Sequence, residues 1–404
     1  MMNFPVDDTG YFIVCNADKD QDDFKKIMKF EDYLNKIKTF TDDILIPNEE
    51  QLENDGEVST SIMEKIIEND LFGISIPKNY GGLGLSMKEQ ILLTFEFTRA
   101  SAVYRSRFST TIGLCSQALL DFGTDKQKDK YLPLMASGKT VGSFALTEPN
   151  AGSDALSLET SAKKDGEEYI INGTKKYITN APYADVFLVM AKTNPDIDGS
   201  KGISSFLVDS NLSGIEIGET PKMLGQKGSV SPEVYFKNCR VNKDALLGEM
   251  EGGGLKPALR GINHARLHVA GTCVGQAKRL IKESILFANN RIQFNKPISQ
   301  MASVQNLISD SYSEMLAAEA LTLSAAKKFD KGIIPETEIS SAKYYASEMV
   351  SKVADRSLQI MGGAGYLEDN VITRFYRDTR LFRLYEGTSQ IQQRNIARKI
   401  IKEI

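Results

Sequence analysis

Residues 144–154 read Phe144-Ala145-Leu146-Thr147-Glu148-Pro149-Asn150-Ala151-Gly152-Ser153-Asp154. This stretch separates two parts of the chain that differ in pattern. From about Asp22 to Lys139 apolar residues recur at the spacing of a helix, whereas after the stretch short β-rich runs alternate with turn signals such as Asn172-Gly173. The stretch itself leads from a strand into a turn rich in NH and OH donors. By pattern alone, that turn could hold the polar edge of a cofactor or be an ordinary β-turn.

The β-rich part extends from about Thr140 to Met250 and shows no helical pattern between its runs. The runs are Tyr169-Ile170-Ile171, Val186-Phe187-Leu188-Val189, Ser205-Phe206-Leu207-Val208 and Val234-Tyr235-Phe236. Strands without intervening helices predict an antiparallel sheet that forms a barrel or a sandwich. We expect Tyr177 and Thr179 to share one face of a strand, because alternate residues of a strand point the same way.

After Gly252-Gly253-Gly254 the helical pattern returns and continues to the end of the chain. The sequence therefore predicts an α+β protein of three domains. They are an N-terminal helical domain at residues 1–139 with an irregular lead-in at 1–20, a middle antiparallel β-domain at 140–250, and a C-terminal helical-bundle domain at 251–404.

The composition is that of an ordinary globular protein. Of the 404 residues 41% are hydrophobic and 25% are charged, and a net charge of -4 without a basic tract argues against a nucleic-acid partner. The four cysteines, Cys15, Cys115, Cys239 and Cys273, are far apart, which favours free thiols over a disulfide framework or a zinc site. The N-terminus lacks the pattern of a signal or transit peptide, and no run of ~20 apolar residues could span a membrane, so we expect a cytoplasmic protein without membrane partners.

Two segments near the C-terminus are unusual in composition. They read Gln359-Ile360-Met361-Gly362-Gly363-Ala364-Gly365-Tyr366 and Tyr385-Glu386-Gly387-Thr388-Ser389-Gln390-Ile391-Gln392. The glycines let a backbone approach a ligand closely, although a helix C-cap and turn would use them equally well. Glu386 precedes a glycine and a helix start at Thr388 or Ser389. Its carboxylate therefore either points into a cavity or stays exposed near a helix N-terminus, where the dipole favours it.

Taken together, these segments resemble the signatures of the acyl-CoA dehydrogenase family. Residues 147–154 look like its first signature, and the segments that start at Gln359 and Tyr385 look like its second. Arg291-Ile292-Gln293-Phe294 resembles the Arg-x-x-Phe element of the family, and Tyr177-Ile178-Thr179 is similar to its aromatic-Ile-Thr strand. Order and spacing agree over roughly residues 30–404, which is nearly the whole chain.

The resemblance implies a helical N-terminal domain, a β-domain and a C-terminal four-helix bundle, assembled into homotetramers that are dimers of dimers. It implies FAD bound without a Rossmann fold and shared across a subunit interface, in keeping with the missing dinucleotide fingerprint. It further implies an oxidoreductase of fatty acid and lipid metabolism that converts an acyl-CoA to a trans-2-enoyl-CoA, with an electron-transfer flavoprotein as electron acceptor.

Site residues are carried over by position. Those implied to line the flavin are Phe144, Leu146, Thr147, Ser153, Tyr177 and Ile178, with Tyr177 on the isoalloxazine ring, and Thr179 near its N5. Those implied to hold the rest of FAD are Thr388 and Gln390 at the diphosphate, and Arg291, Phe294, Gln359, Gly362 and Gly363 at the adenosine half from a neighbouring subunit. Those implied to contact the substrate are Ser153, Asn263, Arg266, Tyr385 and Gly387.

The resemblance assigns Glu386 as the base that removes the α-proton. Most family members use the Glu of Tyr-Glu-Gly-Thr, and others use a Glu just before an Arg on an earlier helix. That earlier segment here ends in Ala265-Arg266, and Ala265 cannot accept a proton. Burial by the bound acyl chain is expected to raise the pKa of Glu386, and the family's mechanism then transfers the β-hydrogen to flavin N5 as hydride.

Other interpretations stay open. Tyr104-Arg105-Ser106 resembles a segment of glutaryl-CoA dehydrogenases, so Arg105 either binds the distal carboxylate of a dicarboxylyl-CoA or is a surface or interface residue. An acyl-CoA oxidase or a non-catalytic flavoprotein relative would use the same scaffold. His264 and His268 have a metal-binding spacing on a helix, but no third ligand is near in the sequence, which favours ordinary helix residues.

Three positions depart from the family pattern. Asn295 stands where the family usually has Gly, and Met301-Ala302 stands where an aromatic residue or His is followed by Gln. Asn263 replaces an Asp that some members use toward the substrate. Flavin binding is still expected, and whether Asn295 and Ala302 weaken contacts with FAD is left open.

Overall fold

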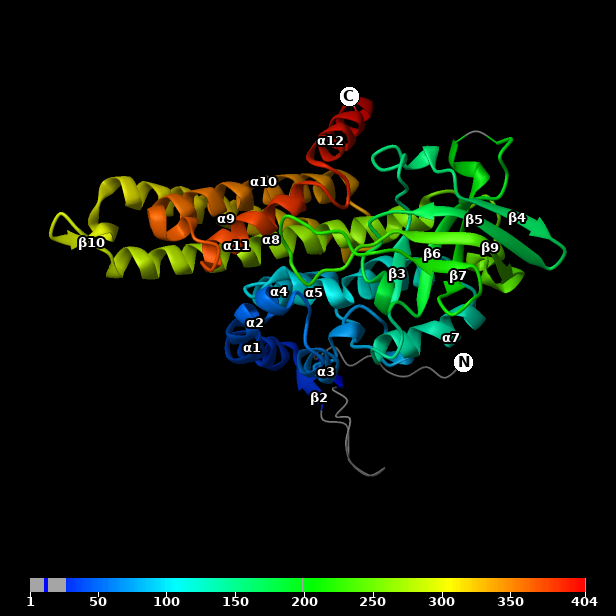
Figure 1. Ribbon diagram of the computed structural model, residues 1–404, viewed down its shortest axis with the longest axis horizontal. Helices are drawn as coiled ribbons and strands as arrows, with labels where there is room; N and C mark the ends of the chain where they lie inside the picture. Colours follow the sequence, from blue (N-terminus) through cyan, green and yellow to red (C-terminus); the bar gives the residue numbers. More distant parts are fainter. Residues whose placement is uncertain (1–10, 14–26, 198, 404) are drawn as a thin grey trace.

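The computed structural model describes residues 11–13, 27–197 and 199–403, in which three consecutive parts are visible (Figure 1). The first part is helical and consists of α1 (Phe30–Phe40), α2 (Glu49–Asp55), α3 (Thr60–Glu68), α4 (Met87–Phe97), α5 (Ala102–Ser109), α6 (Ser116–Phe122) and α7 (Asp125–Ala136). A π-helical stretch, Thr110–Cys115, connects α5 to α6. α7 starts with a capping box between Thr124 and Gln127.

The lead-in at residues 1–20 is described only at Tyr11–Ile13. These residues form β1, which pairs antiparallel with β2 (Ile27–Lys29). The expectation of irregular structure is therefore wrong for β1, and the rest of the lead-in, including Cys15, lies outside the described residues.

The middle part is a seven-stranded sheet. Its strands are β3 (Gly142–Ala145), β4 (Ser161–Asp165), β5 (Glu168–Lys175), β6 (Val186–Lys192), β7 (Ile203–Asp209), β8 (Ile215–Ile217) and β9 (Val234–Asn242), in the order β3-β6-β4-β5-β9-β8 with β7 also on β6. All four β-rich runs of the sequence lie in these strands. The sheet is mixed, because β6 runs parallel to β3 and β4 while the other pairs are antiparallel. The β4–β5 hairpin supplies the crossover that a parallel β3–β6 pair requires.

Two local expectations for this sheet are wrong. Asn172-Gly173 lies inside β5 at a bulge between Ile171 and Gly173, and the β4–β5 turn is instead at Gly166. Tyr177 and Thr179 do not share a strand face, because β5 ends at Lys175 and Tyr177 has a φ of 58°. Alternating side chains require extended backbone, and residues 176–180 leave it.

The third part is a bundle of helices. It consists of α8 (Lys256–Asn290), α9 (Ala302–Phe329), α10 (Glu336–Met361), α11 (Val371–Thr379) and α12 (Ser389–Glu403), with the short hairpin β10 (Ile292–Gln293) and β11 (Lys296–Pro297) between α8 and α9. The helices α8, α9 and α10 lie side by side, α11 and α12 pack on α10, and α8 also packs on α4 (Figure 1). We propose domain boundaries in the connections before β3 and before α8, near residues 139 and 250.

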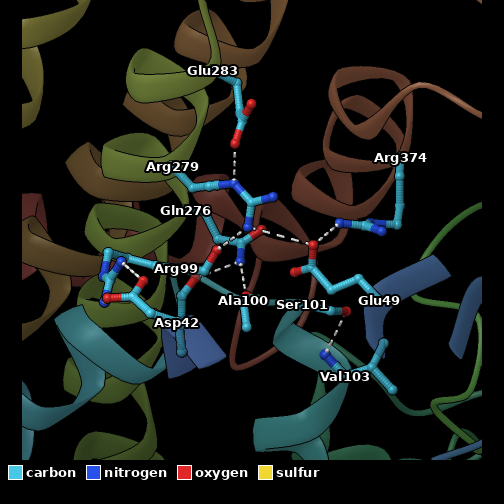
Figure 2. A network of polar contacts seen from close by, with 11 residues as sticks. Asp42, Glu49, Arg99, Ala100, Ser101, Val103, Gln276, Arg279, Glu283 and Arg374 are labelled. Carbon is cyan, nitrogen blue, oxygen red and sulfur yellow. Dashed lines mark hydrogen bonds and ion pairs between the residues drawn. The ribbon is translucent and has the colours of Figure 1, made fainter. Parts of the chain in front are cut away.

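A buried network of charges joins the first and third parts (Figure 2). Glu49 of α2 accepts a hydrogen bond from Arg374 of α11 at 2.6 Å, and Arg279 of α8 lies 3.4 Å from the same carboxylate oxygen. All three side chains are buried. Breaking a buried ion pair costs about 3–5 kcal/mol, so this network fixes α11 against α2 and α8. The turn that carries Glu386 follows α11 after a short 3-10 helix, Arg380–Arg383.

Some expectations concern the whole chain. Cys115, Cys239 and Cys273 are buried free thiols, as predicted. Across the described ranges no helix has the length and apolar character needed to cross a membrane. The same ranges contain no cluster of three or more His, Cys, Asp or Glu side chains that could bind a metal ion.

Candidate active site

Glu386 lies in the turn between α11 and α12, and its backbone is strained. Its φ is 54°, and that of Gly387 is 89°. A left-handed residue other than glycine is uncommon, and such strain persists only where the surroundings impose it, often at functional sites. The helix α12 begins at Ser389, where the Thr388 hydroxyl accepts a hydrogen bond from the backbone N–H of Ile391 at 3.3 Å. The expected helix start is confirmed, and Thr388 is its cap.

Three side chains hold the main chain of this turn. Arg266 of α8 donates from Nε to the Glu386 carbonyl at 3.0 Å, and Lys343 of α10 donates to the Gly387 carbonyl at 2.8 Å. The Gln392 amide donates to both carbonyls at 3.0 Å. These bonds impose the left-handed conformation, because they fix both main-chain oxygens from three helices.

The carboxylate of Glu386 accepts no hydrogen bond from the three cations around it. Burial raises its pKa to about 7, while Arg266, Lys343 and Arg105 lower it less strongly. These three cations act on the carboxylate through space, without a hydrogen bond to it. The side chain is only partly buried by its accessible surface, so a ligand can still reach it. A carboxylate with a pKa near 7 is a stronger base than an ordinary one and is still ionised at physiological pH.

Glycine is required at position 387. A Cβ there would lie 2.8 Å from the Gln392 amide nitrogen and 3.2 Å from a guanidinium nitrogen of Arg266, in addition to the strain of a φ of 89°. The two side chains that would collide with it also hold the turn. The Glu-Gly pair of the sequence motif thus has a local structural cause.

Arg105 of α5 faces the same turn. Its side chain is buried, and burial lowers its pKa to about 10, while Tyr385 and Glu386 act on it through space in the opposite direction. In the described part of the chain its guanidinium donates no hydrogen bond to another side chain or carbonyl. A buried cation in this state favours an anionic ligand, because desolvation of an unpaired charge is costly.

The two histidines of α8 lie beside Arg105 and are neutral. Burial, Arg105 and Arg260 lower the pKa of His264 to about 3, and burial followed by Arg105 lowers that of His268 well below its usual value. Their rings are 4.9 Å apart, and His268 contacts Gln90 at 3.0 Å and Thr94 at 3.1 Å. They are therefore packing residues that tolerate a neighbouring cation.

Asn263 and Arg266 meet next to the turn, one helical turn apart on α8. Arg266 donates from Nη1 to the Asn263 side-chain oxygen at 2.9 Å, and both side chains are buried. Tyr385 precedes Glu386 in the same turn, and Arg105 and Glu386 both act on its pKa. Four of the residues expected to contact substrate, Asn263, Arg266, Tyr385 and Gly387, thus gather around Glu386, while the fifth, Ser153, is exposed in the turn after β3.

The turn after β3 is held by a buried ion pair. Lys175 at the end of β5 donates to the Glu148 carboxylate at 2.7 Å and to the Leu146 carbonyl at 3.2 Å. The same carboxylate accepts the backbone N–H groups of Glu159 at 2.5 Å and Thr160 at 3.0 Å. Lys175 is fully buried, and burial lowers its pKa to about 8. The pair fixes the position of the turn against β4 and β5.

The residues expected to line the flavin lie around this turn. Phe144 and Thr147 are partly exposed and Ser153 is exposed, whereas the side chains of Leu146 and Ile178 are buried, so that a ligand could reach Ile178 only at its backbone. The ring of Tyr177 is 61% exposed. The Thr179 hydroxyl contacts that of Ser231 at 3.0 Å. An exposed aromatic ring among hydroxyl groups suits a flat ligand with polar edges, such as a flavin.

Contacts connect this region to the Glu386 turn. The Asn180 amide donates to the Ser106 carbonyl at 2.7 Å and to the Thr110 hydroxyl at 3.0 Å. Ser106 follows Arg105 on α5, and Arg105 faces Glu386. The helix α5 and its continuation therefore contact both regions, the segment after β5 through Asn180 and the Glu386 turn through Arg105.

The residues expected at the adenosine half lie elsewhere. Arg291 and Phe294, at the end of α8, are exposed, Phe294 by 86%, and Gln359, Gly362 and Gly363 are exposed at the end of α10. Ile360 packs with Ala288 and Ile298, so the two groups share one end of the bundle. Figure 1 shows that end opposite the β-sheet. Within one chain, these residues are not brought to Tyr177.

Sequence reasoning missed four residues of the site, namely Gln226, Lys343, Asp378 and Gln392. Lys343 left a signal, because it occupies a position in the apolar stripe of α10 formed by Ile339, Ala346 and Val350. A charged residue there is costly to bury and suggests a specific partner. Gln392 lies in the quoted segment at residues 385–392 but was given no role. Gln226 and Asp378 left no signal, because they meet through the backbone N–H of Gln226.

Family models match nearly the whole chain. The N-terminal domain of acyl-CoA dehydrogenases matches residues 30–139, the middle domain residues 143–239 and the C-terminal domain residues 252–401. Among curated relatives, a 3-(aryl)acrylate reductase of Clostridium sporogenes is 37% identical and an acyl-CoA dehydrogenase of Bacillus subtilis 35%, each over 90% of this chain and 96% of the relative. The caffeyl-CoA reductase-Etf complex subunit CarC of Acetobacterium woodii is 36% identical over 91% of this chain and 95% of its own.

Solved structures agree with these relatives. A glutaryl-coenzyme A dehydrogenase in complex with glutaryl-CoA superimposes with a TM-score of 0.89 at 31% identity, covering 94% of this chain and 97% of that one. PigA with FAD and proline superimposes with a TM-score of 0.89 at 28% identity, covering 95% and 100%. With its three matched domains, its relatives and its helix–sheet–helix architecture, the chain belongs to the acyl-CoA dehydrogenase family of oxidoreductases.

Proposed function

We propose that this protein is an FAD-dependent enzyme that dehydrogenates an acyl-CoA between its α- and β-carbons, with Glu386 as the base for the α-proton. The observation that carries the proposal is the state of Glu386. Its main chain is held by Arg266 and Lys343, whereas its carboxylate has no hydrogen-bonded partner among those cations and a pKa of about 7. A structural carboxylate would normally be paired, and a carboxylate kept free near pH 7 is suited to accept a proton.

The surrounding side chains tune this base in two ways. Arg266, Lys343 and Arg105 keep the pKa of Glu386 from rising further under the influence of burial, so the carboxylate is ionised near neutral pH. Arg266 and Lys343 also fix the main chain from which the Glu386 side chain extends, because they bind the carbonyls of residues 386 and 387. Positioning of this kind is what converts proximity into rate.

FAD fits the residues on the other side of the site. The exposed ring of Tyr177 and the hydroxyls of Thr147, Ser153 and Thr179 offer stacking and hydrogen bonds to a flavin, as the family implies. When bound, FAD supplies the acceptor for the two electrons and the β-hydrogen of the substrate. Thr388 and Gln390 are proposed to contact its diphosphate, although the Thr388 hydroxyl also caps α12.

A second copy of the chain would complete the cofactor site. The helix α8 has 35 residues and is therefore about 50 Å long, and Arg291 and Phe294 lie at its end away from the sheet. The same holds for Gln359, Gly362 and Gly363. We therefore propose that these residues contact the adenosine half of an FAD held by another subunit, in the dimer of dimers that is usual for the family.

The relatives bear on the direction and the partner of the reaction. Some are named as dehydrogenases and others as reductases, and one is a subunit of a complex with an Etf. Oxidation and reduction of the same bond use the same groups by microscopic reversibility. We propose dehydrogenation with an electron-transfer flavoprotein as acceptor, in the fatty acid metabolism of the cytoplasm, and the reverse reduction as the competing direction.

The reaction can be identified by its product. Purified holoprotein is incubated with an acyl-CoA panel of increasing chain length and an artificial one-electron acceptor, and the thioesters are analysed by mass spectrometry. Loss of two hydrogens from one substrate class supports the proposal. Formation of peroxide in air with the same product would indicate an acyl-CoA oxidase, and bound FAD with no product from any acyl-CoA would indicate a non-catalytic relative.

Arg105 supports a second candidate, a dehydrogenase of dicarboxylyl-CoA substrates such as glutaryl-CoA. Its buried guanidinium faces Tyr385 and Glu386 and donates no hydrogen bond within the described ranges. An acyl chain whose α-carbon lies at Glu386 and whose far end carries a carboxylate would supply the missing anion. A solved glutaryl-coenzyme A dehydrogenase complex superimposes on nearly the whole chain.

A further inference from the structure

The connection between β8 and β9 touches both halves of the proposed site. Its second half, residues 225–232, contacts α11 and Tyr385 at one end and residues 178–180 at the other. Tyr385 precedes the proposed base, and Thr179 is proposed to lie beside the flavin. The segment therefore bridges the proposed proton-accepting and hydride-accepting sides through hydrogen bonds at its two ends.

Asp378 of α11 anchors the first end. Its buried carboxylate accepts a short hydrogen bond from the backbone N–H of Gln226, and the Gln226 amide donates to the Asp378 carbonyl at 3.3 Å. A Cβ at Gly225 would lie 2.7 Å from the Asp378 carboxylate, so the chain passes directly over it. Burial raises the pKa of Tyr385 above its usual range, and a hydrogen bond from the Gln226 side chain acts in the opposite direction.

Asp378 is not used by the arginines of its own helix. Arg374 donates to Glu49 at 2.6 Å, and Arg377 donates to Glu53 at 2.5 Å. Figure 2 shows Arg374 directed at Glu49. Because both arginines donate to other carboxylates, the side chain of Asp378 is bound by the backbone N–H of Gln226 instead. Displacement of that N–H would leave the buried carboxylate without this donor, so the bond fixes the position of residue 226.

The second end is held by three contacts. The Ser231 hydroxyl lies 3.0 Å from that of Thr179, and the Pro232 carbonyl accepts the N–H of Ile178 at 3.0 Å. The Val230 carbonyl accepts the N–H of Asn180 at 2.9 Å. These contacts continue the sheet ladder into the irregular segment that carries Tyr177, which has no strand partner of its own.

The segment between the two ends is folded into turns and packed against α2. Gln226 has a φ of 52°, and the Ser229 N–H closes a turn onto the Gln226 carbonyl at 3.0 Å. Gly228 has a φ of 93° and lies against Leu52 of α2. A short, turned segment packed on a helix transmits a displacement of one end to the other.

We propose that residues 225–232 form a strap that sets the position of the Glu386 turn relative to residues 177–180, and that Asp378 is the positioning residue that anchors it. The inference rests on the proposed function, since removal of a proton and a hydride from adjacent carbons requires two acceptors in fixed relation. A displacement of about 1 Å in such a geometry can cost about 10²-fold in rate.

Asp378→Ala removes the anchor, and Asp378→Asn keeps an oxygen acceptor for the Gln226 N–H. Gln226→Leu keeps the main-chain bond and removes only the side-chain contacts with Tyr385 and the Asp378 carbonyl. Leu224→Ala is the matched control, because Leu224 precedes the strap and is 70% exposed. Asp244→Asn controls for the loss of a carboxylate in an exposed ion pair with Lys126.

Hydrogen–deuterium exchange of the FAD-loaded proteins tests the anchor without turnover. We expect faster exchange at residues 225–232 in Asp378→Ala, unchanged exchange in α8, and near wild-type exchange in Asp378→Asn and both controls. In anaerobic single-turnover reduction by a saturating acyl-CoA, we expect Asp378→Ala to be about 10²-fold slower, with partial recovery in Asp378→Asn and unchanged FAD content.

The outcomes separate the strap from the proposed function. Wild-type exchange and wild-type reduction rate in Asp378→Ala would overturn the strap, as would a Gln226→Leu variant that is as slow as Asp378→Ala. Should Asp378→Ala fail to fold, wild-type rate and exchange in Asp378→Asn together with full loss in Gln226→Leu would also overturn it. A wild-type protein that no acyl-CoA reduces would instead overturn the proposed function, while the exchange data would still report on the anchor.

Discussion

Arg266 donates from Nε to the main-chain carbonyl of Glu386 at 3.0 Å, and it acts on the carboxylate of that residue only through space. Arg266 therefore holds the backbone of the proposed base rather than neutralising its side chain. A direct bidentate pair would have lowered the pKa of Glu386 and removed it as a base. The arrangement allows a partly buried carboxylate to stay both fixed in place and reactive.

Substitution of Lys343 should shift the pH dependence of the reaction. Lys343 lowers the pKa of Glu386, so Lys343→Met should move the acid limb of kcat/KM to higher pH, in addition to lowering the plateau through loss of the bond to the Gly387 carbonyl. The measurement is kcat/KM from pH 5 to 9 for wild type and variant. Lys352→Met, on the same helix and 62% exposed, is the matched control. An acid limb that stays in place or moves to lower pH would contradict the assignment.

The raised pKa of Glu386 should also appear in stability. In the folded protein this group binds a proton with a pKa of about 7, against an ordinary pKa of 4.5, so the folded state binds more protons between these values. Stability from this group is therefore lost as pH rises from 4.5 to 7, on the order of 1 kcal/mol per pKa unit. Glu386→Gln should be stabilised relative to wild type at pH 8 but not at pH 4.5. Thermal unfolding of both at the two pH values checks this, and a pH-independent difference would refute it.

Gly387→Ala should damage the turn selectively. The added Cβ would meet Gln392 at 2.8 Å and Arg266 at 3.2 Å, and a left-handed alanine costs about 1–2 kcal/mol by itself. We expect activity to fall more than tenfold, because the Cβ would displace Arg266 and Gln392, which hold the carbonyl of the proposed base. Gly332→Ala offers a control with a similar φ of 78° and open space around it. Equal effects of the two substitutions on activity would show that backbone strain alone is responsible.

Lys175→Met should lower stability and FAD retention together. It leaves the Glu148 carboxylate buried beside its remaining backbone donors but without the ammonium, and loss of one partner of a buried pair costs about 3–5 kcal/mol. Lys237→Met breaks an ion pair with Glu216 in the same sheet that is more than half exposed, and it should cost at most about 1 kcal/mol. Denaturant unfolding and the flavin-to-protein ratio report both effects. Comparable losses in the two variants would refute a special role for the buried pair.

Arg105→Gln should discriminate between substrates if the second candidate function holds. Loss of the guanidinium should reduce kcat/KM for glutaryl-CoA by about 10- to 10²-fold, since a hydrogen bond to a charged group contributes about 1.5–3 kcal/mol, with a far smaller effect on pentanoyl-CoA. The two thioesters have equal chain length and differ in the terminal carboxylate. Equal losses for both would assign Arg105 to tuning of Glu386 rather than to substrate selection.

The sequence predicted the order of helical, β-rich and helical parts because apolar periodicity records which face each element buries. It located Glu386 through its motif. It could not show that β6 runs parallel to β3, since strand direction depends on a crossover that no local pattern records. The extended strand expected at Tyr177 failed for a related reason: its backbone is fixed by contacts with residues 230–232, far away in the chain.

Part of the site forms only through contacts between residues that are far apart in the sequence. Gln226 and Asp378 are separated by 152 positions and meet through a backbone N–H, which carries no side-chain signature. Lys343 could have been found, because a lysine in an apolar helical stripe needs a buried partner. Arg291 and Gln359 were assigned to a cofactor by resemblance alone. In the single chain they lie at the end of the bundle away from the proposed flavin-lining residues.

The central claim is that Glu386 accepts the α-proton. Its most direct test is anaerobic bleaching of the flavin near 450 nm, a wavelength roughly expected of oxidised FAD, in wild type and Glu386→Gln with the acyl-CoA that the product assay identifies. We expect rapid bleaching in wild type and a rate lower by about 10²–10⁴-fold in Glu386→Gln, at equal FAD content, because general-base catalysis contributes on that order. Bleaching of Glu386→Gln at the wild-type rate would contradict the account.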